Sequence, residues 1–172
     1  MSVDLSSVIA ATAQWLLRAY PANGGPFSRA LAEAQARQAT TVAAWLRYPT
    51  SVDAALVSLV GPGGSGRLDW LMTSDEPDID DHAWRTWVDE VVASWAACLL
   101  TDPALAELAV TALSGSDHAA GTPADFRRLT SPGEQDLSAA PLLRHPDLLT
   151  SVTELYREDL VQRLEADPVE AA

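Results

Sequence analysis

Lysine is absent from this chain of 172 residues, and cysteine occurs once. All 11 basic residues are Arg, which together with the heavy use of Ala, Leu and Val indicates a GC-rich genome rather than a function. A single cysteine excludes a disulfide within the chain. Cys98 lies in an apolar stretch, and burial there raises the pKa of a thiol. We therefore interpret it as a core residue and not as a nucleophile.

Long apolar runs and a basic N-terminal segment are also missing. No stretch approaches the roughly 20 apolar residues that a membrane span needs. The opening Met1-Ser2-Val3-Asp4 lacks the basic region of a signal peptide. Hydrophobic residues make up 48% of the chain and charged residues 20%, as in globular proteins. We expect a cytoplasmic protein without membrane association, with one domain over 1–166 and a frayed tail over 167–172.

Negative charge is in excess and unevenly distributed. The formal net charge is −13. Residues 1–68 carry five Arg against three acids, whereas residues 69–172 carry 21 acids against six Arg. An acidic surface repels phosphate backbones, so direct binding of nucleic acid is not expected. A chain divided in this way can associate with a basic partner, or with itself head to tail as a homo-oligomer.

Helical periodicity dominates every long segment, and no alternation typical of strands persists. The sequence predicts an all-α fold, an irregular or orthogonal bundle of five or six main helices with Gly/Pro-rich loops. Thr50 or Ser51 is expected to cap the third helix, and Asp102-Pro103 to begin a later one. Shorter helices are expected at 68–72, near Thr122-Pro123 and around 137–143. The main predicted helices span 5–20, 28–48, 51–60, 80–99, 103–113 and 147–166.

The segment Gly61-Pro62-Gly63-Gly64-Ser65-Gly66 follows an apolar run and has the outline of a phosphate-binding P-loop. Two positions then depart from that motif. Arg67 replaces the lysine that contacts the phosphates, and Leu68 replaces the hydroxyl residue that binds magnesium. We favour a flexible linker between helices over a nucleotide site.

Residues 75–82 combine five carboxylates with one imidazole. Asp78 and His82 are four positions apart and would share a helix face, a combination that suits zinc, manganese or iron. The other histidines, His118 and His145, lie in separate loop regions, and acids are favoured at a helix N-terminus for electrostatic reasons alone. We interpret the segment as a structural or interacting charge cluster, and expect no metal and no cofactor.

Two further patterns contain residue types that catalytic or ligand-binding sites use, but not in the arrangement that such sites need. Ser116-Asp117-His118 has the residue types of a hydrolase triad, but neighbouring side chains cannot form its hydrogen bonds in series. We therefore interpret it as a turn and expect no catalytic residue. One inward-facing helical stripe is predicted to hold Trp84, Val88, Val91 and Trp95. Trp87 lies at its edge, where an exposed Trp would anchor an interface.

No motif is specific to one family. The segment from Asp80 to Leu113, a Trp-rich helix followed by Asp-Pro and a second amphipathic helix, resembles in outline the ligand-binding domains of TetR-type regulators. No helix-turn-helix domain precedes it, and no residue role is carried over.

The leading hypothesis is a non-catalytic helical interaction protein, an accessory subunit or adaptor of a larger cytoplasmic assembly that binds a protein partner with a basic surface. One alternative is a small-molecule-binding bundle or metal-dependent enzyme that uses Trp84, Trp95, His82 and Asp78. A weaker one is an acidic mimic of nucleic acid. Candidate interaction residues are Asp75, Glu76, Asp78, Asp80, Asp81 and Trp87.

Overall fold

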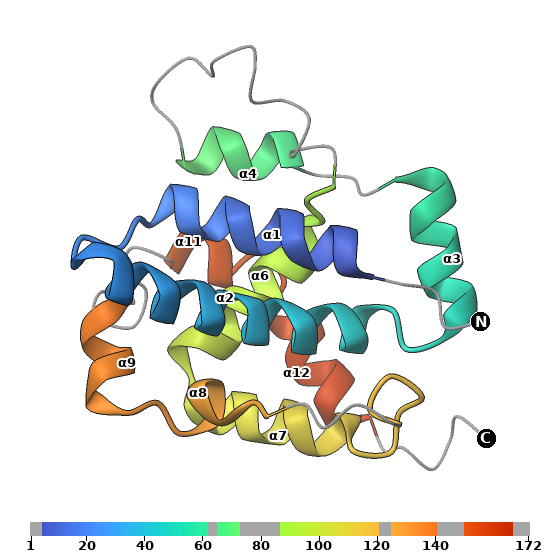
Figure 1. Ribbon diagram of the computed structural model, residues 1–172. Helices are drawn as coiled ribbons and strands as arrows, with labels where there is room; N and C mark the ends of the chain where they lie inside the picture. Colours follow the sequence, from blue (N-terminus) through green and yellow to red (C-terminus); the bar gives the residue numbers. More distant parts are fainter. Residues whose placement is uncertain (1–4, 62–64, 73–86, 121–124, 141–149, 167–172) are drawn as a thin grey trace.

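The computed structural model describes residues 5–61, 65–72, 87–120, 125–140 and 150–166 (Figure 1). Every regular element in these ranges is a helix, so the all-α prediction is confirmed. Ten helices are described, more than the predicted five or six, but only α1, α2, α3, α6 and α7 have ten residues or more. The helices are α1 Ser6–Ala19, α2 Gly25–Arg47, α3 Ser51–Val60, α4 Ser65–Met72, α6 Glu90–Thr101, α7 Pro103–Leu113, α8 Arg127–Thr130, α9 Glu134–Ala139, α11 Thr150–Thr153 and α12 Arg157–Glu165.

The core lies between α2 and α6, which pack most extensively on each other, with α1 covering one side. Small side chains make this contact possible, because they let two helix backbones approach closely. The inner faces of α2 and α6 are rich in fully buried alanines: Ala36, Ala39, Ala43, Ala44, Ala93, Ala96 and Ala97. Larger residues such as Leu16 of α1 and Leu99 of α6 fill the remaining space. The core is therefore built on one long central helix.

A tight connection makes a hairpin of α1 and α2, which lie side by side (Figure 1). Gly25 has φ +86°, a left-handed conformation that favours glycine. A side chain on Gly24 would meet the Ser28 Oγ at 2.2 Å. Pro26 occupies the first turn of α2, where no N–H donor is required. As a result α2 begins at Gly25, three residues before the predicted start at Ser28.

The caps predicted for α3 and α7 are present. Thr50 accepts a hydrogen bond from the Asp53 N–H at 3.2 Å, and the Asp53 carboxylate accepts one from the Thr50 N–H. At the start of α7, the Asp102 side chain accepts a hydrogen bond from the Leu105 N–H at 3.1 Å. Each cap satisfies an N–H group that the helix itself cannot pair.

The predicted helix over 80–99 begins later than expected. Trp87 and Val88 are not helical, and Asp89 is the N-cap of α6, where its side chain accepts a hydrogen bond from the Val91 N–H at 2.9 Å. Residues 80–86 lie outside the described part of the chain. The apolar stripe of Trp84, Val88, Val91 and Trp95 therefore does not belong to one continuous helix.

The prediction of one continuous last helix over 147–166 is wrong. It is divided into α11 and α12 by a non-helical turn at 154–156. The Ser94 hydroxyl of α6 accepts from the Tyr156 N–H at 3.0 Å, and the Tyr156 carbonyl accepts from the Trp95 indole N–H at 3.0 Å. The Tyr156 N–H therefore bonds to a side chain of α6 in place of a carbonyl of the preceding helical turn, whereas the Glu154 N–H and the Tyr156 carbonyl keep helical bonds to Thr150 and Leu160.

The short helices α8 and α9 are joined by a charged pair. Arg128 donates to Asp136 Oδ1 at 2.5 Å, and the Gly133 N–H donates to Asp136 Oδ2 at 3.0 Å. Burial alone would raise the pKa of Asp136, but the hydrogen bonds from Gly133 and Arg128, the nearby Gln35 and the positive charge of Arg128 together hold the pKa below its ordinary value. The helices predicted near Thr122-Pro123 and at 137–143 correspond to α8 and α9 only roughly.

None of the described helices is both long enough and apolar enough to cross a membrane. The single-domain assignment over 1–166 stays a prediction, and the tail over 167–172 lies outside the described residues.

Candidate functional site

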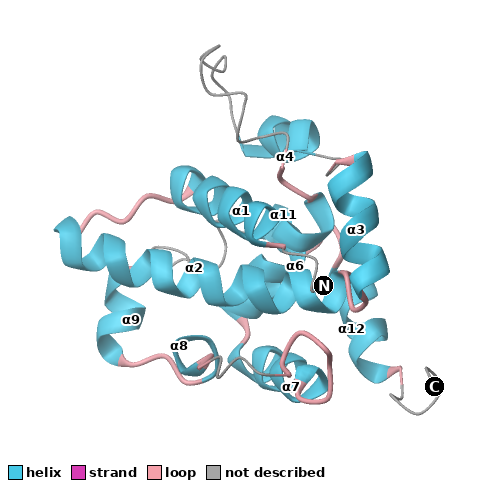
Figure 2. Ribbon diagram, turned by 45° about the vertical axis from the view of Figure 1, so that its right-hand side comes forward, coloured by secondary structure: helices cyan, strands magenta, loops and turns pink. Residues whose placement is uncertain are grey.

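Helix α3 carries an apolar stripe that faces away from the core. Val52, Leu56, Leu59 and Val60 are spaced four, three and one residues apart, which places them on one side of a helix. Their exposed fractions are 66%, 52%, 83% and 82%. The opposite side of α3 is buried through Ala54 and Val57. We call the four exposed residues the α3 stripe; α3 itself lies at the edge of the molecule in both ribbon views (Figures 1 and 2).

A cleft of about 530 Å³ separates α3 from the start of α6. We call it the α3–α6 cleft. Leu56 and Val60 belong both to its wall and to the α3 stripe, so the exposed apolar surface continues into the cleft. The lining residues come from the end of α2, from α3, from the start of α6 and from the turn before α12: Arg47, Tyr48, Asp53, Leu56, Val57, Val60, Gly61, Asp89, Glu90, Val91 and Tyr156.

Two tyrosine–carboxylate pairs form the polar side of this cleft. Tyr48 at the end of α2 donates a hydrogen bond from its hydroxyl to Asp89 Oδ2. Tyr156 donates from its hydroxyl to Glu90 Oε2 at 3.1 Å. Asp89 and Glu90 are adjacent, and both are buried. Each carboxylate is therefore fixed by a phenol that comes from a distant part of the chain.

Both tyrosines remain neutral donors at physiological pH. Burial raises the pKa of Tyr48, and the hydrogen bond to Asp89 raises it further. Burial also raises the pKa of Tyr156, with the hydrogen bond to Glu90 adding to it. A phenol with a raised pKa is a poor base and a poor nucleophile. These groups can hold the carboxylates in place, and the carboxylates can accept hydrogen bonds from a ligand.

The charges of the α3–α6 cleft do not balance. Asp53, Asp89 and Glu90 contribute three carboxylates, and Arg47 contributes one guanidinium. The guanidinium carbon of Arg47 lies 5.5 Å from the centre of the Tyr48 ring, in cation–π contact. The N-terminal end of α6 partly compensates Asp89 and Glu90 through its dipole. The cleft as a whole suits a cation.

A second cleft of about 580 Å³ adjoins the first. The two share Arg47, Val91 and Tyr156. Trp95 lines the second cleft, together with Asp159 and Arg163 of α12. Trp95 itself is almost fully buried, as expected for a core residue. Among the described residues it is the only member of the predicted ligand set Trp84, Trp95, His82 and Asp78, because the other three lie outside the described ranges.

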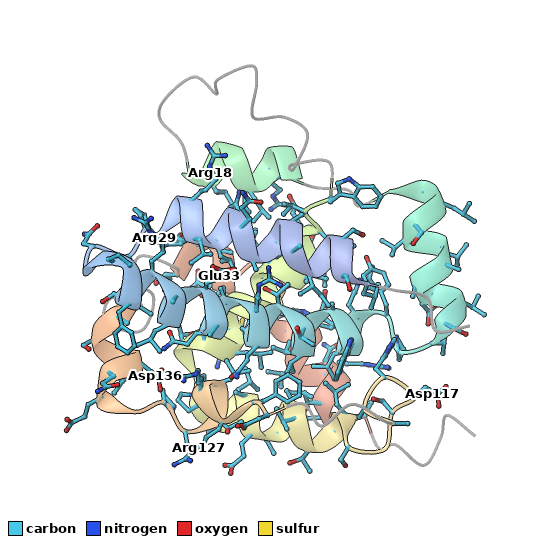
Figure 3. All side chains as sticks on the ribbon, in the orientation of Figure 1. Arg18, Arg29, Glu33, Asp117, Arg127 and Asp136 are labelled. Atoms are coloured by element: carbon cyan, nitrogen blue, oxygen red, sulfur yellow. The ribbon has the colours of Figure 1, made fainter. Side chains whose placement is uncertain are left out.

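The loop after α7 does not form a catalytic triad. His118 Nε2 lies 2.6 Å from the Tyr48 carbonyl oxygen, and its ring stacks on Trp45 with the ring centres 5.7 Å apart. Ser116 instead accepts a hydrogen bond from the Ala119 N–H at 3.4 Å. Figure 3 shows Asp117 at the outer edge of this loop. The interpretation of the segment as a turn agrees with this geometry.

The glycine-rich segment and Cys98, also considered in the sequence, have structural explanations. The apolar run before Gly61 is helix α3 rather than the strand that a P-loop follows, and Leu68 is fully buried. Cys98 is fully buried too, and its thiol donates to the Thr153 carbonyl at 3.2 Å. Burial raises the pKa of that thiol. In the described ranges no three His, Cys, Asp or Glu side chains gather as metal ligands would.

The predicted interaction residues are described only in part. Trp87 is 37% exposed and lies two positions before Asp89. Asp75, Glu76, Asp78, Asp80 and Asp81 lie outside the described residues. The sequence reasoning missed the α3 stripe, although a helix that is apolar on both sides was a visible signal. It also missed the pairs of Asp89 and Glu90, for which the sequence offers only an acidic pair before an apolar run.

Comparison of the chain with protein-family models, with curated proteins and with solved structures gives no match.

Proposed function

We propose that this chain is a non-catalytic helical interaction protein, an accessory subunit or adaptor that binds a partner polypeptide. The observation that carries the proposal is the α3 stripe. Isolated exposed apolar residues are ordinary, but four on one helix face amount to a contiguous patch of the kind that marks protein interfaces. The patch also continues into a cleft with polar acceptors, as interfaces with an apolar centre and a polar rim do.

The acidic segment fits the same proposal from the sequence side. Asp75, Glu76, Asp78, Asp80 and Asp81 precede Trp87 and Asp89 closely in the chain. Carboxylates at a rim speed the encounter with a basic partner more than they tighten the complex. A partially exposed Trp87 would supply an apolar anchor there. The partner that we propose therefore has both apolar and basic residues.

The test is co-purification with the full chain as bait. The double substitution Leu59→Ser and Val60→Ser removes apolar surface that the core does not use. Leu108→Ser on α7 is the matched control, because Leu108 is 61% exposed and belongs to no such stripe. The proposal expects partners retained by the wild type and by Leu108→Ser to be lost from the double variant. Equal retention by all three proteins would refute it.

A second arm tests the acidic segment separately. Asp78, Asp80 and Asp81 are changed to Asn, and retention is compared at low and high salt. Electrostatic steering predicts slower association of the partner with the variant, and so lower retention, at low salt and no difference at high salt. Equal retention at every salt concentration would leave these acids without a role in binding.

A small-molecule site is the second candidate, and cleft size favours it. Volumes of about 530 and 580 Å³ fall within the range of ligand pockets, about 300–1,000 Å³. Tyr156 lines both clefts and Trp95 lines the second, so a flat ligand would have aromatic walls. A thermal-shift screen tests this, because a ligand at about 100 times its Kd adds about 2.7 kcal/mol to the stability.

A further inference from the structure

Glu90 has one carboxylate oxygen that is buried and unused. The residue is 7% exposed, and its Oε2 accepts the Tyr156 hydroxyl. Its Oε1 accepts no hydrogen bond in the described part of the chain. A buried charged acceptor without a partner is costly, and structures rarely retain one without a reason. The α6 dipole explains why a negative charge is tolerated here, but it gives Oε1 no donor.

The cationic side chains nearby do not satisfy this oxygen. Arg47 lies over the Tyr48 ring, and no ion pair joins it to Glu90. Arg67 of α4 is exposed, and it is close enough to Tyr156 to lower the pKa of that phenol slightly, against the larger effect of burial. It makes no hydrogen bond to Glu90 Oε1. Among the described side chains Oε1 therefore has no donor, and it is enclosed in the wall of the α3–α6 cleft.

We propose that Glu90 Oε1 in the α3–α6 cleft binds the guanidinium group of an arginine on the partner polypeptide. The apolar residues beside that arginine lie on Leu56 and Val60, which line the same cleft. This inference rests on the proposed function and assigns the chemistry of the partner. It makes Glu90 a specificity residue, because a partner without a cation leaves the acceptor unpaired.

Arginine fits this cleft better than lysine. Its guanidinium is more weakly hydrated than an ammonium group, so less hydration is lost when it enters a buried site. Its several N–H donors can bond more than one acceptor at once, and Asp89 lines the same cleft as Glu90. Asp89 and Glu90 are held by Tyr48 and Tyr156, so the acceptors are positioned before the ligand arrives. Three carboxylates against one lining arginine supply the complementary charge.

The experiment uses three probes with the full chain. The first is the peptide Ac-Ala-Leu-Arg-Leu-Ala-NH2; the second has citrulline, a neutral near-isostere, in place of arginine; the third is agmatine, a free guanidinium compound. Binding is followed by NMR through the Val91 amide and the Tyr156 ring. The arginine peptide is expected to bind at least tenfold more tightly than the citrulline peptide. It should also bind at least tenfold more tightly than agmatine, which has no apolar residues.

Two variants test whether the difference between the arginine and citrulline peptides depends on Glu90. Glu90→Gln keeps the shape and should reduce the arginine–citrulline difference to less than threefold, with an unchanged or raised Tm. Glu107→Gln on exposed α7 is the matched control and should retain the full difference. Should Glu90→Gln fail to fold, the NMR shifts of the Val91 amide and the Tyr156 ring on the wild type still show whether the arginine peptide binds in the cleft and the citrulline peptide does not. Equal binding of both peptides to the wild type overturns the inference.

The remaining outcomes are distinct from failure of the proposed function. Agmatine that binds as tightly as the arginine peptide shows a site for a free amine and overturns the assignment to a polypeptide. Loss of partners from the α3 double variant, combined with equal binding of the two peptides, overturns the arginine assignment alone. An arginine preference that depends on Glu90 supports it.

Discussion

Helices α2 and α3 are adjacent in the chain, yet their apolar side chains lie in opposite environments. Five alanines of α2 are buried in the core that α2 forms with α6 and α1: Ala32, Ala36, Ala39, Ala43 and Ala44. Helix α3 buries Ala54 and Val57 and exposes Val52, Leu56, Leu59 and Val60. Buried apolar surface in α2 stabilises the fold, whereas the exposed apolar surface of the α3 stripe contributes little to the stability of the isolated chain. This difference is the basis for assigning α3 to a partner.

The largest effect should come from the core side of this comparison. Leu99 of α6 is fully buried, so Leu99→Ala removes packed atoms and leaves a cavity. We expect a loss of about 2–5 kcal/mol in the free energy of unfolding. Urea denaturation measures it, with Leu108→Ala as the exposed control at less than about 0.5 kcal/mol. A small loss at Leu99 would contradict the described core.

A smaller effect is expected where α6 interrupts the last helix. Ser94→Ala removes the acceptor of the Tyr156 N–H and a donor to the Thr153 carbonyl. Unsatisfied buried groups cost about 1–3 kcal/mol. Urea denaturation and faster amide exchange at Tyr156 check this, with exposed Ser138→Ala as the control. Unchanged exchange at Tyr156 would mean that the turn does not depend on Ser94.

Acid should weaken the contact of α8 and α9. The pKa of Asp136 is lowered in the folded chain, so its contribution is present above the unfolded value near 3.9 and is lost as pH falls through the folded pKa. Asp136→Asn is expected to lose about 1 kcal/mol at neutral pH. Denaturation from pH 7 to pH 2 should show this difference constant above about pH 5 and closing below about pH 4. A constant difference throughout would exclude a charge effect.

The smallest effect is predicted for the α3 stripe. Leu59 is 83% exposed, so Leu59→Ser removes no contact with the core. The free energy of unfolding should change by less than about 0.5 kcal/mol. Chemical denaturation of the isolated chain checks this, with Ala54→Ser on the buried side of α3 as the destabilising comparison. A large loss at Leu59 would show that α3 uses its outward side for folding.

Sequence reasoning predicted what local rules determine. The helices, the Thr50 and Asp102 caps and the burial of Cys98 follow from periodicity and capping alone. It failed where contacts between residues far apart in the chain determine the structure. The turn at 154–156 depends on Ser94 and Trp95, some 60 positions away, which no local pattern encodes. The same holds for the cleft, because Tyr48 and Tyr156 meet Asp89 and Glu90 only in the folded chain.

Site-specific photo-crosslinking tests the central claim most directly. A benzophenone amino acid is placed at position 59 in one variant and at position 108 in another, and both are irradiated in the cells that express the chain. If the α3 stripe binds a partner, position 59 will give a discrete crosslinked polypeptide that position 108 does not give. The crosslinked peptide should contain arginine next to apolar residues. Identical products from both positions, or none from position 59, would contradict the account.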